Sequence, residues 1–535
     1  MTTPVSTDDV RATLVAREEI ALLDVREEDL FAQSHPLWAA NLPLSKLELE
    51  AWGRIPRRDT RIVVYDDGEG LAERAVERLH SLGYTDVKLL EGSLAGWRTS
   101  GGELFRDVNV PSKSFGELVE SQRHTPSLSA EEVQALLVQN ADVVVLDARR
   151  FDEYQTMNIP GSTSVPGGEL VLRARELAPD PTTRVIVNCA GRTRSIIGTQ
   201  SLVNAGLPNP VAALRNGTIG WTLAGQALEH GAARRFGPEV SAEHRDAARI
   251  AAADVARRAG VAWLDAATLA QWLREAQRTT YLFDVRTPEE YAAGHRVGFR
   301  SAPGGQLVQE TDVHAPVRSA RIVLTDGGNE EDGVRAPMTA SWLAQMGWQV
   351  AVLDAPMPSA DALETGPDKA PQPPPPAVRS VTPATLADWL ATNDAAVIDV
   401  TASANYVKRH VPGAWFAVRS QLPELLPELL LRVGTPRRLV LTCGSSLLAR
   451  FAAKDIEVLT SSEVWVLEGG TAAWLAAGLP IESGDTHLLS RRIDRYRRPY
   501  EGTDNAAAAM QAYLDWEFGL VEQLGRDGTH HFFVV

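Results

Sequence analysis

The sequence predicts an α/β protein made of four tandem copies of one domain. An apolar strand that ends in aspartate occurs four times, closing at Asp24, Asp147, Asp284 and Asp399. A second apolar strand follows each one, and the residue after it lies 42 positions beyond the aspartate in three copies and 44 in the fourth. Helix-period segments separate the strands, which predicts mostly parallel sheets with helices on both faces. The spacing between copies is 123 residues from Asp66 to Cys189 and 117 from Asp326 to Cys443, which corresponds to a small domain rather than a short solenoid repeat.

The four copies, here called repeats one to four, have readable limits. We expect them at residues 1–110, 125–235, 262–360 and 380–485. A leucine followed seven residues later by tryptophan, with glycine between them, closes repeats one, two and four at Trp97, Trp221 and Trp474. A tail at 491–535 follows, with a run of arginines and a helix expected over 505–523. It is expected to pack on a neighbouring domain, with partner binding as the alternative.

Repeat two shows the expected order of elements most completely. Its segments are a helix over 129–140, a strand over 143–146, a turn at Pro160–Gly161, a helix over 169–177, a strand over 185–188, a helix over 195–204 and a strand over 211–214. Two linkers flank repeat three: an Ala/Arg/Glu-rich helical connector and a proline-containing extended spacer, at 241–260 and 366–383. Ligands of such sheets bind at the carboxyl ends of the strands, where Cys189 is expected.

Composition narrows the range of partners and compartments. The formal net charge is −16 and the sequence pI is about 5.3, which argues against nucleic acid or an anionic membrane as the main partner. Two cysteines in 535 residues exclude a disulfide scaffold and fit a reducing cytosol. Residues 1–9 lack the pattern of a signal peptide, and no apolar run approaches the roughly 20 residues of a membrane span. We therefore expect a cytoplasmic protein.

The residue after the second strand of repeat two begins a reactive loop. Its residues are Cys189, Ala190, Gly191, Arg192, Thr193 and Arg194. A loop closed by a helix N-terminus brings backbone N–H groups and the positive end of the helix dipole together, which attracts anions. With two arginines, this placement is expected to lower the thiol pKa from about 8.5 to roughly 3.5–7.5. The alternatives are a buried, inert cysteine and arginines that are merely solvated.

Several motifs together resemble the rhodanese family over nearly the whole chain. They are the Asp-Val-Arg strand end, the Glu290-Tyr291…Gly294-His295 segment, the Pro-Gly turns at Ile159–Ser162 and His410–Ala414, the strand–Cys–loop–helix unit and the closing Leu…Trp motif. The resemblance implies a five-stranded, helix-flanked parallel sheet in each domain. It also implies sulfur transfer through a persulfide on the loop cysteine, which requires no metal or organic cofactor.

The four copies differ at the position of the nucleophile. Repeats one and three carry Asp66 and Asp326 there, and aspartate holds no sulfane sulfur and repels thiosulfate, so the resemblance implies that these repeats are inactive. Repeat four keeps Cys443, but its loop, residues 444–449, has no basic residue. Cys189 is therefore the expected catalytic residue with 190–194 as its substrate-binding loop. Cys443 is the candidate for a second site, with an inert buried thiol as the alternative.

The expected reaction takes sulfur from thiosulfate, a small anionic donor, and passes it to cyanide or a thiol by ping-pong kinetics. The acceptor could also be a thioredoxin-like or other persulfide-accepting protein. Alternatives are a 3-mercaptopyruvate or protein-persulfide sulfurtransferase and a non-catalytic scaffold. A phosphatase with a Cys-x5-Arg loop is disfavoured, because Arg194 comes one residue too early after Cys189 and Ser195 stands in its place.

Overall fold

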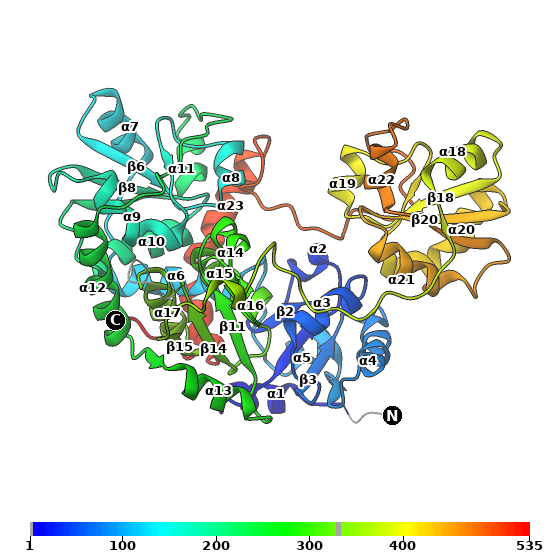
Figure 1. Ribbon diagram of the computed structural model, residues 1–535, viewed down its shortest axis with the longest axis horizontal. Coiled ribbons are helices and arrows are strands. Elements are labelled where there is room, and N and C mark those ends of the chain that lie inside the picture. Colours follow the sequence, from blue (N-terminus) through cyan, green and yellow to red (C-terminus); the bar gives the residue numbers. More distant parts are fainter. Residues whose placement is uncertain (1–3, 328–332) are drawn as a thin grey trace.

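The computed structural model describes residues 4–327 and 333–535 and contains one parallel sheet in each repeat (Figure 1). In repeat two the strand order is β5-β9-β8-β6-β7. The strands are β5 (Ser127–Leu128), β6 (Val143–Asp147), β7 (Thr163–Ser164), β8 (Arg184–Asn188) and β9 (Val211–Leu214). Since β6 and β8 pair in parallel with Asp147 beside Asn188, Cys189 follows at the carboxyl edge of the sheet.

Repeats three and four have the same arrangement of strands. Their orders are β10-β15-β14-β11-β13 and β17-β21-β20-β18-β19. The strands of repeat three are β10 (Ala262–Leu264), β11 (Thr280–Asp284), β13 (Arg300–Ser301), β14 (Arg321–Thr325) and β15 (Gln349–Leu353). Those of repeat four are β17 (Ser380–Val381), β18 (Ala395–Asp399), β19 (Trp415–Phe416), β20 (Arg438–Thr442) and β21 (Glu463–Leu467). A short antiparallel pair, β12 (His295–Arg296) with β16 (Leu363–Glu364), is added beside repeat three.

Repeat one departs from the expected count of five strands. Its order is β2-β1-β3-β4, with β1 (Ala21–Asp24), β2 (Ala39–Asn41), β3 (Ile62–Tyr65) and β4 (Val87–Leu89). An isolated parallel bridge between Val5 and Leu90 stands where the fifth strand would lie. The fold of helix-flanked, mostly parallel sheets is confirmed, while the expectation of five strands is wrong for this one sheet.

Helices cover the sheets of all four repeats. Repeat one has α1 (Thr7–Val15), α2 (Glu28–Phe31), α3 (Leu47–Arg54), α4 (Leu71–Ser81) and α5 (Ser93–Thr99). Repeat two has α7 (Ala130–Val138), α8 (Phe151–Thr156), η1 (Gly167–Glu169), α9 (Leu170–Leu177), α10 (Thr193–Asn204) and α11 (Gly217–Leu223). Repeat three has α13 (Ala266–Arg274), α14 (Pro288–Ala293), α15 (Gly304–Gln309), α16 (Thr311–His314), α17 (Arg335–Gln345) and η2 (Ala360–Ala362). Repeat four has α18 (Pro383–Ala391), α19 (Ser403–Lys408), η3 (Arg419–Gln421), α20 (Leu422–Val433), α21 (Leu447–Ile456) and α22 (Gly470–Ala476).

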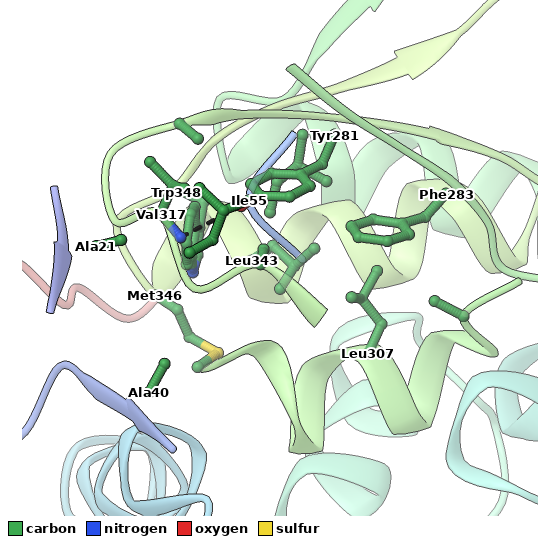
Figure 2. Packing of buried hydrophobic residues seen from close by; sticks show 14 of the residues in the cluster. Ala21, Ala40, Ile55, Tyr281, Phe283, Leu307, Val317, Leu343, Met346 and Trp348 are labelled. Atoms are coloured by element: carbon green, nitrogen blue, oxygen red, sulfur yellow. Dashed lines mark hydrogen bonds between the residues drawn. The ribbon is translucent and has the colours of Figure 1, made fainter. Parts of the chain in front are cut away.

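Two connecting helices and a shared core join repeats one to three. The connectors are α6 (Val110–Arg123), which contacts α10, and α12 (Ala242–Arg258), which contacts α9 and α17. Apolar side chains from repeats one and three form a single cluster between the sheets, shown in Figure 2 with Ala21, Ala40, Tyr281, Phe283, Leu343 and Met346 among its members. Repeat four stands to one side in Figure 1. It meets repeat one through Arg419, whose guanidinium binds both carboxylate oxygens of Glu48 at 2.7 and 2.8 Å.

The C-terminal tail runs across the first three repeats. The expected single helix is divided at Gly519 into α23 (Ala507–Phe518), which contacts α6 and α11, and α24 (Leu520–Asp527), which packs on repeat one. The last residues reach the core between repeats one and three, where Phe532 packs edge-on against Trp38 and Phe115. No helix within the described ranges has the length and apolar character that crossing a bilayer requires.

Candidate active site

The loop that begins at Cys189 is fastened to the start of α11. The Cys189 carbonyl accepts a hydrogen bond from the Thr218 N–H at 2.9 Å, and the Ala190 carbonyl accepts one from Ile219 at 3.0 Å. Gly217 makes this approach possible, since a Cβ there would lie 2.3 Å from the Cys189 carbonyl oxygen and its φ is +54°. The closing motif of repeat two thus holds the loop.

The Cys189 thiol is buried, with 2% of the residue exposed. Its S–H donates to Ser195 Oγ at 3.4 Å, and that hydroxyl donates to the Arg192 carbonyl at 2.8 Å. Burial raises the pKa of the thiol, although the Arg194 charge and hydrogen bonds from Ser195 act in the opposite direction. The expected lowering of this pKa is wrong, because burial outweighs the positive surroundings.

Both loop arginines are engaged by carboxylates. Arg192 donates to both oxygens of Glu117 at 2.7 and 2.8 Å, pairs with Glu120 and lies 4.3 Å above the Phe518 ring. Arg192 therefore fixes the loop to α6 and to the tail. Arg194 donates to both oxygens of Glu153 at 2.7 and 2.8 Å.

Arg194 also acts on the thiol. Its charge lowers the pKa of Cys189 against the opposing effect of burial. Repeat three contains an ion pair equivalent to that of Arg194 with Glu153, since Arg335 binds both oxygens of Glu290 at 2.7 and 3.0 Å. Glu153 and Glu290 are both the glutamate of a Glu-Tyr motif. This motif could have predicted which carboxylate pairs with Arg194.

Helix α23 of the tail covers the Cys189 loop. A Cβ on Gly191 would lie 3.1 Å from the Tyr513 ring and 3.5 Å from Glu517 Oε2. Tyr513 donates to Glu517 Oε1 at 2.8 Å. Burial and the neighbouring Glu117 raise the pKa of Glu517 to about 8. Residues 189–193 are all buried as a result, and no local pattern in the loop sequence indicates this cover.

A cavity of about 200 Å³ adjoins the start of α11, the helix whose first N–H groups bind the loop. Repeat two contributes Met157, Thr218 and Ile219 to its wall, and the tail contributes Tyr500 and Met510. The tail therefore forms one side of this cavity.

The corresponding loops of repeats one and three show what this loop geometry holds. The Asp66 carboxylate accepts hydrogen bonds from the N–H groups of Gly68, Leu71 and Ala72 at 3.0, 2.8 and 3.2 Å. Burial alone would raise the pKa of Asp66, but these bonds bring it below its ordinary value. The loop is thus an anion cradle, and here a fixed carboxylate fills it.

The same arrangement occurs in repeat three. Asp326 Oδ2 accepts from the N–H groups of Gly333, Val334 and Ala336 at 3.0–3.1 Å. In repeats two and four a cysteine occupies this position at the head of the loop.

Cys443 occupies that position in repeat four, with 4% of the residue exposed. Burial raises its pKa, while backbone N–H groups of Ala449, Ser445 and Leu448 act to lower it. Gly470 repeats the role of Gly217, since its Cβ would lie 2.2 Å from the Cys443 carbonyl oxygen. Unlike the loop of repeat two, this loop is exposed at Gly444 and Ser445.

A helix-flanked parallel sheet with a cysteine at the head of an anion-cradling loop defines the class of rhodanese-like domains. A family model described as the rhodanese-like domain matches residues 6–100, 129–224 and 382–477, and the chain belongs to the rhodanese family. Repeat three lies outside the matched ranges but has the same strand order.

Sulfurtransferases are among the relatives of this chain. A probable 3-mercaptopyruvate sulfurtransferase of Pseudomonas aeruginosa is 34% identical over 139 residues, which are 25% of this chain and 47% of that protein. A thiosulfate sulfurtransferase of the same organism is 30% identical over 181 residues, 29% of this chain and 66% of that protein. The chain thus aligns with less than two thirds of either relative. A crystal structure of a thiosulfate sulfurtransferase from Pseudomonas aeruginosa is 68% identical, covers 100% of both chains and has a TM-score of 0.96. The chain is a sulfurtransferase of the rhodanese type.

Proposed function

We propose that this protein transfers sulfane sulfur from thiosulfate to cyanide or a small thiol through a persulfide on Cys189. The observation that carries the proposal is the anion cradle of the repeated loop, filled by carboxylates in repeats one and three and headed by a nucleophile in repeat two. By the same reasoning, repeats one and three are inactive domains. The relatives named above act on thiosulfate or 3-mercaptopyruvate by their descriptions, and 3-mercaptopyruvate is the alternative donor.

The reaction begins with the thiolate of Cys189. It attacks the outer sulfur of thiosulfate, the sulfur–sulfur bond of the donor breaks, and sulfite leaves with the bonding electrons. The N–H groups of residues 190–194 hold the terminal sulfur of the persulfide, and Arg194 supplies positive charge near the thiolate. Arg192 positions the loop through Glu117. Cyanide or a thiolate then removes the terminal sulfur and restores the thiolate.

The cover over the loop bears on the acceptor. Residues 189–193 are buried beneath Tyr513 and Glu517, so an acceptor of a few atoms fits the closed arrangement. A thioredoxin-like or other persulfide-accepting protein would reach Cys189 only after α23 moves. The composition favours the cytoplasm as the place of this reaction.

Thiocyanate formation tests the assignment. We expect Cys189→Ser to abolish most thiocyanate production from thiosulfate and cyanide by the full chain. In the unmodified protein, thiosulfate alone should add the mass of one sulfur atom to the peptide that carries Cys189. Full activity of Cys189→Ser, or an unmodified Cys189 peptide, would contradict the proposal. Replacing thiosulfate by 3-mercaptopyruvate identifies the preferred donor.

A further inference from the structure

Repeat four contains a cavity at the loop that Cys443 begins, with Gly444 in its wall. The cavity has a volume of about 350 Å³. Its wall includes polar and charged residues together with Gly444 of the loop: Thr401, Asn405, Lys408, Arg409, Gly444 and Thr471. It occupies the same place in its domain as the cavity at the start of α11 in repeat two, since Thr471 and Thr218 are equivalent residues of the closing motif. In repeat two the tail forms one wall, whereas the wall of this cavity comes from repeat four alone.

One substitution sets this domain apart from the other three. In repeats one to three an arginine two residues after the strand aspartate pairs with it, as Arg149 does with Asp147 at 2.7 Å. Repeat four has Thr401 at this position, on the cavity wall. Asp399 therefore lacks that partner, and its fully buried Oδ2 has no hydrogen-bond partner within the described ranges. Burial raises the pKa of Asp399 to about 7, so it carries less negative charge than an ordinary aspartate near neutral pH.

The charge on the cavity wall is positive and unneutralised. Lys408 and Arg409, at the end of α19, are exposed. Within the part of the chain that the structure describes, neither has a carboxylate at ion-pair distance. Arg192 and Arg194 beside Cys189 are both paired. The charge that the loop of repeat four lacks is thus supplied by a neighbouring helix.

The Cys443 loop also offers the cradle that an anionic sulfur requires. Three backbone N–H groups, of Ser445, Leu448 and Ala449, favour the thiolate of Cys443, as the N–H of Ser195 does at Cys189. The helix that follows, α21, has ten residues, and its positive end faces the same loop. Nucleophile, cradle, cationic wall and access therefore occur together in this repeat.

We propose that Cys443 is a second sulfur-accepting site, which takes a small anionic sulfane-sulfur donor that Lys408 and Arg409 attract. The Cys443 thiol loses its proton to solvent, and the thiolate attacks the outer sulfur of thiosulfate. A new sulfur–sulfur bond forms while that of the donor breaks, and sulfite leaves with the electron pair. The persulfide stays on Cys443 until a thiol or cyanide removes its outer sulfur. This site is independent of the role assigned to Cys189.

The test uses the full chain with Cys189→Ser, so that Cys443 is the remaining thiol. Thiosulfate is the probe, and peptide mass spectrometry follows the gain of one sulfur atom on the Cys443 peptide over time. We expect the peptide to be modified. At low ionic strength, Lys408→Gln with Arg409→Gln should slow the modification about tenfold, since a local positive field raises the encounter rate of an anion. Arg98→Gln with Arg274→Gln, two exposed arginines in other repeats, is the control of equal charge and should leave the rate unchanged.

The outcomes separate this site from the site at Cys189. An unmodified Cys443 in Cys189→Ser, with a modified Cys189 in Cys443→Ser, overturns the second site and leaves the proposed function standing. A modified Cys443 with an unmodified Cys189 supports the second site and overturns the proposed role of Cys189. A rate that does not change when Lys408 and Arg409 are replaced overturns the recognition of the anion by these residues.

Discussion

At the scale of single residues, Glu517 has the least expected position. It lies in the tail, more than three hundred residues from Cys189 in the sequence, yet a Cβ on Gly191 would come within 3.5 Å of its Oε2, so its carboxylate lies next to the Cys189 loop. It is fully buried, and its Oε2 has no hydrogen-bond partner within the described ranges. Its charge adds to the effect of burial in raising the pKa of the Cys189 thiol. Glu517 therefore opposes ionisation of the proposed nucleophile.

Replacing Glu517 by glutamine should lower the pKa of Cys189. The amide keeps the shape of the side chain but removes the like charge, so the thiolate becomes easier to form. In the Cys443→Ser background, the thiolate absorbance of Cys189 against pH should have its midpoint roughly 0.5–1 unit lower than with Glu517 present. Glu243→Gln, in α12, is the control and should leave the midpoint in place. A midpoint that stays or rises would show that Glu517 does not act on the thiol.

At the scale of elements, the start of α11 and the helix α6 hold the Cys189 loop from two sides. Gly217 lets α11 approach the Cys189 carbonyl, and the N–H groups of Thr218 and Ile219 bind the loop from that side. On the other side, α6 holds Arg192 through Glu117. The loop is thus held by two helices besides the one that follows it.

A side chain on Gly217 should disrupt this arrangement. Gly217→Ala places a Cβ 2.3 Å from the Cys189 carbonyl oxygen, whereas Gly225→Ala, just after α11, meets nothing within 4 Å; both have positive φ, +54° and +72°. Each variant bears the backbone cost of roughly 1–2 kcal/mol, and only Gly217→Ala adds a clash. We expect a clearly larger fall in the melting temperature for Gly217→Ala by calorimetry. Equal falls in the melting temperature of the two variants would show that the loop moves away from the added Cβ without loss of stability.

The same elements show how far the sequence predicts the site. The apolar runs before Asp147 and Cys189 predict two parallel strands, because buried strands read as continuous β-branched segments. The loop and its helix follow from the same pattern. The burial of the Cys189 loop by α23 and the basic cavity wall formed by Lys408 and Arg409 do not follow from this pattern. Both depend on which distant segments meet in the fold. For this reason the sequence predicts a lowered pKa for Cys189, whereas burial in the folded protein raises it.

At the scale of the whole molecule, the two cysteine-bearing domains differ in how they are held. Repeat two is fixed by α6, α12 and the tail, and the tail also joins repeats one and three. Repeat four contacts repeat one through charged groups, chiefly Arg419 with Glu48 and Asp455 with Arg78. A cysteine loop covered by the tail and a cysteine loop that is exposed at Gly444 and Ser445 are thus combined in one chain.

The last residues of the tail should stabilise repeats one to three without affecting repeat four. Phe532 packs on Trp38 and Phe115 at ring distances of 5.7 and 5.3 Å, while its neighbour Phe533 is 42% exposed. Phe532 is partly buried, so Phe532→Ala should cost about 1–3 kcal/mol and Phe533→Ala less. Hydrogen exchange, resolved by peptide, should rise in β1 and β14 in Phe532→Ala while β20 stays protected. Faster exchange in β20 as well would mean that repeat four depends on the tail, and the division of the molecule into a three-domain body and a separate domain would have to be abandoned.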